Sequence, residues 1–141
     1  MKAFRIVSLV VFTSSSSVLF AQAKDSVSLG ADEKIVSVAE TIPAFSYKGK
    51  GISEFIMENL KYPQTAIDNG IEANIIVDFV VDTMGRVLYV VSKDNGNARK
   101  QILVDEAIRV IKATSGYWKP GYTNGKKVRM RMRIPITFKL D

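Results

Sequence analysis

Residues 127–140 read KVRMRMRIPITFKL, and this stretch does the most to decide the fold. Every second side chain in it is apolar, and the residues between are basic, polar or, at one position, proline. Successive side chains of a β-strand point to opposite faces of a sheet, so a period of two predicts a long terminal strand with one buried face. The apolar residues of the pattern are Val128, Met130, Met132, Ile134, Ile136, Phe138 and Leu140.

A second period-two pattern lies earlier in the chain, over residues 73–81. Residues 82–85 read DTMG, and a glycine in such a turn can take the positive φ that a hairpin requires. We therefore expect a hairpin whose returning strand covers residues 86–93. The side chains expected on one side of the returning strand are Val87, Tyr89 and Val91.

Three further segments have helical spacing. The first is expected to begin with Ser53 as its N-cap. A short second helix over residues 63–69 is closed by Gly70, and a third helix over residues 103–114 is ended by Gly116. A glycine just beyond a helix is a common stop signal because it adopts the left-handed conformation easily.

The order of elements, helices then hairpin then helix then strand, predicts an α+β fold. The terminal strand can return beside the first strand of the hairpin, which gives a three-stranded antiparallel sheet in the order 2-1-3. The helices then cover one face of this sheet. A short edge strand is also expected at Ile35–Val38.

The chain has 141 residues and contains neither cysteine nor histidine. This excludes thiol nucleophiles, Ser-His-Asp and Cys-His pairs, disulfides, haem ligation by histidine and ordinary zinc sites, because those chemistries need thiolate or imidazole. We therefore expect a protein that is not an enzyme and that carries no cofactor and no metal. Its 47% hydrophobic and 24% charged residues are typical of a folding, globular sequence.

Residues 1–23 have the pattern of a secretory signal peptide. Lys2 and Arg5 precede an apolar stretch, and the sequence AQA at 21–23 supplies the small residues of a cleavage site. The alternative is an uncleaved membrane anchor. However, the five hydroxyl residues at 13–17 interrupt a stretch already shorter than the roughly 20 apolar residues that a span needs. Loss of Lys2 and Arg5 with these residues lowers the net charge from +6 to +4 and leaves 118 residues.

The mature chain is expected to consist of a flexible leader at 24–41 and one domain at 42–141, with no membrane span. The signal pattern predicts a soluble, exported protein. An exported protein does not usually meet nucleic acid, so the positive charge is not interpreted as a DNA-binding or RNA-binding surface.

The positive charge gathers on the polar face of the terminal strand, in a basic row made of Lys127, Arg129, Arg131 and Arg133. Two interpretations remain open. Basic side chains protect an exposed strand against edge-to-edge aggregation. They also suit an edge that accepts a guest strand from a partner, with main-chain bonds for affinity and arginines for selectivity. The candidate partner-binding residues are Val128, Arg129, Met130, Arg131, Met132, Arg133, Ile134, Pro135 and Ile136.

Pro135 sets the orientation of this strand. A proline is tolerated only where its missing N–H faces an open edge, and successive residues alternate. The backbone groups of Arg129, Arg131 and Arg133 should therefore face the free edge. The pattern at 127–140 is also longer than that at 73–81, so part of the strand should overhang, as a docking site or a homodimer contact.

Two other features have structural explanations that we favour. Asp78 and Asp82 lie about 13 Å apart on one strand face, too far for an acid and base pair, and are expected to pair with basic residues of the terminal strand. Trp118 could be a stacking platform, but fixing a loop onto the core is the commoner use of a tryptophan.

Taken in order, several short motifs closely resemble the C-terminal domain of TonB proteins, over roughly residues 42–141. The resemblance implies a non-enzymatic periplasmic domain with helices on a three-stranded sheet. It also implies that the edge at 128–136 docks the TonB-box segment of an outer-membrane transporter by strand addition. The matching pieces are LKYP at 60–63, GIE at 70–72, EAIR at 106–109, WKPG at 118–121, NGK at 124–126 and IPITF at 134–138.

The chain departs from this family in carrying a signal-like start and a short leader where a transducer has an anchor and a Pro-rich spacer. We therefore expect a protein-binding module in or alongside TonB-dependent transport. The alternative is an envelope structural protein whose basic face binds peptidoglycan or anionic surface polymers.

Overall fold

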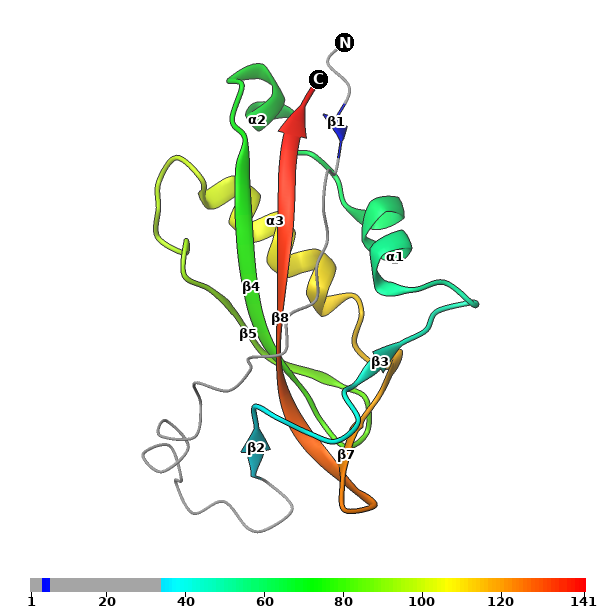
Figure 1. Cartoon of the computed structure of the whole chain (residues 1–141). Helices are drawn as coiled ribbons and strands as arrows, with labels where there is room; N and C mark the ends of the chain where they lie inside the picture. The colour runs from blue at the N-terminus through cyan, green and yellow to red at the C-terminus, as the bar shows by residue number, and fades with distance from the viewer. Residues whose placement is uncertain (1–3, 6–33) are drawn as a thin grey trace.

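The computed structural model describes residues 4–5 and 34–141 (Figure 1). The rest of the predicted signal peptide and leader lies outside the described residues. The elements, in chain order, are β1 (Phe4–Arg5), β2 (Ile35–Val36), β3 (Ala44–Phe45), α1 (Ile52–Asn59), α2 (Gln64–Asp68), β4 (Ala73–Val81), β5 (Val87–Ser92), α3 (Gln101–Lys112), β6 (Trp118–Lys119), β7 (Gly121–Thr123) and β8 (Lys126–Leu140).

The long strands lie side by side in the order β5, β4, β8, and both neighbouring pairs are antiparallel. β4 and β8 pair without a register shift, from Ala73 opposite Phe138 to Val81 opposite Met130. The α+β class is therefore confirmed, with the hairpin and the terminal strand where their alternation predicted them.

The expectation of a three-stranded, wholly antiparallel sheet was wrong. Over residues 4–5 and 34–141 the sheet has six strands, and it is mixed because β2 pairs in parallel with Arg129–Met130 of β8. β1 pairs with Lys139–Leu140, and β7 folds back on Lys126–Val128. These added strands are only two or three residues long, which is too short for an alternating pattern to reveal their neighbours.

The core lies between the sheet and the helices. α3 runs across one face of the sheet and packs against β4 and β5, while α1 packs against α3 (Figure 1). The alternate side chains of β4 and β8 on that face are at most 1% exposed. Burying each such large apolar side chain contributes about 1.5 to 3 kcal/mol, so this layer holds the two strands in register. They are Ile75, Val77, Phe79, Val81, Met130, Met132, Ile134, Ile136 and Phe138.

β5 departs from the predicted alternation at a β-bulge. Val91 lies opposite Asp78 and Leu88 opposite Val80, so the register shifts between these pairs. Tyr89 takes a φ of +54°, a left-handed conformation that is uncommon for residues other than glycine. The bulge adds one residue to β5 between these two pairs, so Val87 and Val91 lie on opposite faces of the sheet. The prediction that they lie on one side of the strand was therefore wrong.

The helix ends are partly as predicted. α1 begins after Gly51 rather than at Ser53, because the N–H of Phe55 already bonds to the carbonyl of Gly51 at 3.1 Å. α2 closes as expected: Gly70 has a φ of +62°, and the N–H of Ile71 returns to the carbonyl of Ala66 at 2.8 Å.

Candidate functional site

One side of β8 pairs with β4, and the other side forms an outer edge of the sheet. β2 covers this outer edge at Arg129–Met130, and β1 covers it at Lys139–Leu140. Between them, residues 131–138 pair with no further strand in the part of the chain that the structure describes. We call this stretch the open edge, and at the usual strand rise it spans about 26 Å.

Pro135 lies directly opposite Ile76 in the β4–β8 ladder. Proline has no N–H, so this pair occupies a position whose backbone groups do not bond across the ladder. The groups of Pro135 therefore point away from β4. Since the register is continuous, the backbone groups of Arg131, Arg133 and Thr137 point outward as well. The open edge thus offers a regular row of donors and acceptors, with a single donor missing at the proline.

The candidate binding residues fall into three groups. Val128 belongs to the β7–β8 hairpin, and the outward side of Arg129 is taken by β2, so these two do not lie on the open edge. Met130 and the even-numbered residues after it, as far as Ile136, point into the core and are at most 1% exposed. The odd-numbered residues Arg131, Arg133 and Pro135 lie on the open edge with outward backbone groups.

The basic row is only partly neutralised. Arg133 holds Asp78 through two hydrogen bonds, Nε to Oδ1 at 2.6 Å and a second guanidinium nitrogen to Oδ2 at 3.2 Å. The hydrogen bond to Asp78 raises the pKa of Arg133, against the opposing effect of partial burial. This pair was expected from the strand order. Asp82 instead binds Arg86 of its own turn, with Nε and Oδ2 2.7 Å apart.

Three other cations near this edge have no ion pair among the described residues: Arg129, Arg131 and Lys139. Arg131 and Lys139 are exposed. The Nε atom of Arg129 is buried and lacks a hydrogen-bond acceptor in the described structure. The outer face beside the open edge is therefore positively charged and incompletely paired.

The opposite edge of the sheet, formed by β5, is less regular. Its bulge at Tyr89 breaks the row of backbone groups, and bulges are a common way to protect an edge against pairing. The two edges therefore differ, and β8 is the one with uninterrupted strand geometry.

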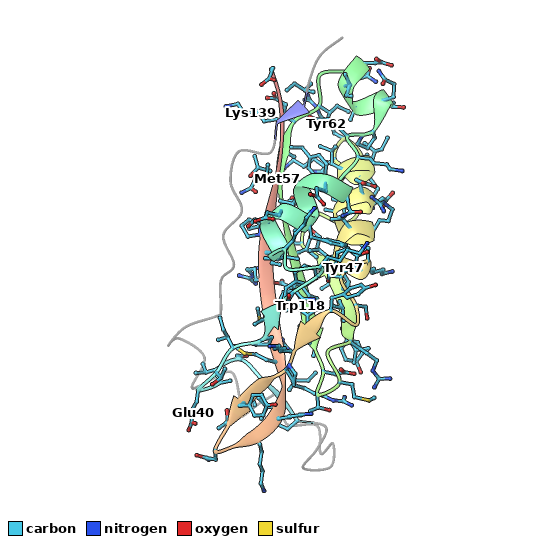
Figure 2. The ribbon with its side chains drawn as sticks, turned by 90° about the vertical axis from the view of Figure 1, so that its right-hand side faces the viewer. Glu40, Tyr47, Met57, Tyr62, Trp118 and Lys139 are labelled. Atoms are coloured by element: carbon cyan, nitrogen blue, oxygen red, sulfur yellow. The ribbon has the colours of Figure 1, made fainter. Side chains whose placement is uncertain are left out.

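Trp118 anchors the end of α3 to the core. It is 6% exposed, and its Nε1–H donates to Oγ1 of Thr114 at 3.0 Å. The rings of Phe45 and Phe79 pack against it with centroids 5.4 and 5.7 Å away. Figure 2 labels Trp118 between the sheet and the helices. This burial favours the structural explanation over a stacking platform.

Thr41, just before the expected domain boundary at residue 42, pairs with Tyr122 of β7. The sequence patterns did not reveal this contact. Thr41 and Tyr122 exchange two backbone hydrogen bonds of 3.0 and 2.9 Å. A Cβ added at Gly121 would lie 2.9 Å from the carbonyl oxygen of Thr41. The glycine of the WKPG motif is the one sequence signal for this contact, since only glycine gives the chain room to pass.

In the described residues, no group of three or more Asp and Glu side chains gathers as a metal ion would require. Within the same residues, no helix is long and apolar enough to cross a membrane.

Comparison with known proteins gives one match. The family model described as Gram-negative bacterial TonB protein C-terminal matches residues 58–140, from the end of α1 to the end of β8. No curated protein and no solved structure matches the chain.

Proposed function

Because the chain belongs to the TonB C-terminal domain family, we propose that it is a periplasmic module that docks a TonB-box-like segment of an outer-membrane transporter. The segment is added as a strand to the open edge of β8. Under this proposal the protein works by binding, in or alongside TonB-dependent transport, and residues 1–23 direct its export.

The observation that carries the proposal is the open edge itself. Residues 131–138 present outward backbone groups in regular strand geometry, and β2 marks one end. β1 lies at the other end but belongs to residues 1–23, so their removal would also free the outer side of Lys139–Leu140. An incoming strand can therefore form main-chain hydrogen bonds at Arg131, Arg133 and Thr137, and loses only the donor that Pro135 lacks. The bulged edge of β5 offers no comparable row.

Backbone NMR with a TonB-box peptide from the same organism tests this proposal. We expect shifts concentrated at residues 131–138. Absence of shifts there at millimolar peptide would remove the docking hypothesis. Shifts confined to the helices or to β5 would contradict it equally.

A pair of variants at Arg131 separates main-chain from side-chain binding. Arg131→Ala removes only the side chain, whereas Arg131→Pro also removes an N–H that points away from β4. Loss of one hydrogen bond should weaken peptide binding by up to about tenfold beyond the alanine variant. Equal affinities for the two variants would argue against strand addition.

The unpaired cations support a second candidate function, the binding of peptidoglycan or another anionic envelope polymer. Arg129, Arg131 and Lys139 supply positive charge without a described ion-pair partner. Binding of this kind depends on charge and should collapse between low and moderate ionic strength, whereas strand addition should largely survive. Affinity measured across a salt series therefore distinguishes the two functions.

A further inference from the structure

We infer that the segment docked on the open edge is acidic, and that Arg131 selects it by pairing with a carboxylate of the guest strand. The inference rests on the proposed strand addition and adds the chemistry of the partner. It is carried by the charge and pairing state of the outer face of β8.

The open edge has a one-sided charge. Residues 131–138 read RMRIPITF and contain two arginines and no acid. Arg133 is already held by Asp78, whereas Arg131 is exposed and lies opposite Val80, which offers it no charge. Arg131 is therefore the free cation within the described open edge.

Strand pairing would bring a guest side chain close to Arg131. Residues directly opposite each other in adjacent strands point to the same face, with Cβ atoms about 5 Å apart. A guest residue paired with Arg131 would therefore lie on the outer face, within reach of the guanidinium. A Glu or Asp there completes an opposite-charge pair, which stabilises a sheet, whereas a Lys or Arg opposes it.

Arg129 adds a second reason for an acidic guest at this end. It lies on the same face as Arg131, about 7 Å further along the strand, and its buried Nε has no described acceptor. Arg129 also has no ion pair among the described residues, so a carboxylate beside Arg131 would be attracted by two neighbouring positive charges. The end of the open edge next to β2 is thus the most favourable place for the acid.

The same charges argue against a second copy of the chain as the occupant. Pairing two β8 strands would place one arginine-bearing, acid-free edge beside another. Like charges on facing strands repel, so charge complementarity favours an acidic partner over self-association.

Charge exchange between protein and peptide tests the inference. Three eight-residue peptides of one apolar sequence carry Glu, Gln or Lys at the residue paired with Arg131, and are titrated into the full chain by NMR. We expect the Glu peptide to bind about two- to fivefold more tightly than the Gln peptide, the range of a cross-strand ion pair. Arg131→Glu should reverse the order, so that the Lys peptide binds best.

Lys112→Glu is the matched control, since it makes the same change in net charge at an exposed position on α3. It should leave the peptide order unchanged. Reversal by both variants, or a Glu preference without shifts at 131–138, would mean general charge attraction and would overturn the inference.

The remaining outcomes separate the inference from the function on which it rests. Equal binding of all three peptides, with shifts at 131–138, overturns acidic selection and leaves strand addition standing. No shifts at 131–138 with any peptide overturns both. Concentration-dependent shifts at 131–138 without peptide would identify a second copy as the occupant and overturn the inference.

Discussion

At Gly85 the fold leaves no room for a side chain. The residue has a φ of +78°, and an added Cβ would lie 2.1 Å from the carbonyl oxygen of Trp118. The carbonyl of Gly85 also accepts the N–H of Gly116 at 2.9 Å. The β4–β5 turn is thus held directly against the chain that leaves α3.

We expect Gly85→Ala to lower the free energy of unfolding by more than about 2 kcal/mol, through backbone strain and the clash with Trp118. Gly49→Ala is the control, because Gly49 also has a φ of +78° but faces open space. It should cost only about 1 kcal/mol. Urea unfolding of the two variants measures the difference, and equal losses would show that strain alone matters.

Glu106 links α3 to the segment between α1 and α2. Its carboxylate accepts the N–H of Lys61 at 2.7 Å and binds Arg109, whose guanidinium also donates to the carbonyl of Asn59 at 2.8 Å. Burial raises the pKa of Glu106, but the hydrogen bonds from Arg109 and Lys61 outweigh it and the net pKa is lowered. The LKYP and EAIR motifs therefore meet at one carboxylate.

This lowered pKa predicts a pH-dependent stability. The ionised form is favoured in the folded state, so its contribution is fully present above the unfolded value near 4.5 and is lost as the pH falls through the lower folded pKa. Glu106→Gln should be less stable than the wild type at pH 7, and the difference should shrink below about pH 4. Denaturant unfolding across pH measures this difference, with the exposed Glu54→Gln as control. A difference independent of pH would contradict it.

At the scale of elements, β8 should show two populations of amide protons. The N–H groups of Arg131, Arg133 and Thr137 point outward, whereas those of Met132 and Ile134 bond to β4. We expect hydrogen exchange to be much faster for the outward set, and binding of a guest strand to slow it. Equal protection of both sets in the free monomer would contradict the assigned orientation.

The same elements mark what the sequence could predict. β4 and β8 were predictable because burial of alternate side chains leaves a local pattern in the chain, and Pro135 fixed the direction of the backbone groups. β2 was expected as an edge strand. Its parallel pairing with β8 joins segments that are far apart in the chain, and such a contact produces no repeating pattern of side chains in the sequence. The bulge at Tyr89 was missed because tyrosine does not favour a left-handed conformation, and tertiary packing imposes it.

The candidate site was predictable to a similar degree. The basic alternation predicted that the terminal strand binds a partner, and this stays a prediction. The structure shows that residues 131–138 are the part of β8 whose outer side pairs with no described strand. The pairing of β2 with Arg129 could not be predicted, because residues 35–36 have no charge and no motif that would indicate Arg129 as their neighbour.

At the scale of the whole molecule, the proposed function requires export. We expect signal peptidase to cleave after Ala23, because Ala21 and Ala23 supply the small residues that the enzyme selects. Intact-mass measurement of the envelope fraction should give a chain that begins at Lys24. Ala23→Arg should retain the precursor, whereas Gln22→Arg, between the two selected positions, should still be processed. A mature wild-type chain that keeps residues 1–23 would contradict this expectation.

The position of β8 also governs when the molecule can fold. β8 supplies the partner of β4 and follows every other described element in the chain. The backbone pair between Thr41 and Tyr122 likewise cannot form until Tyr122 has been synthesised, and Tyr122 follows Thr41 by more than half the chain length. Contacts between such distant segments form slowly, and the pairing of β4 with β8 cannot form before residues 126–140 have been synthesised. The β4–β5 hairpin can form earlier, but the fold stays incomplete until the last described strand has been made.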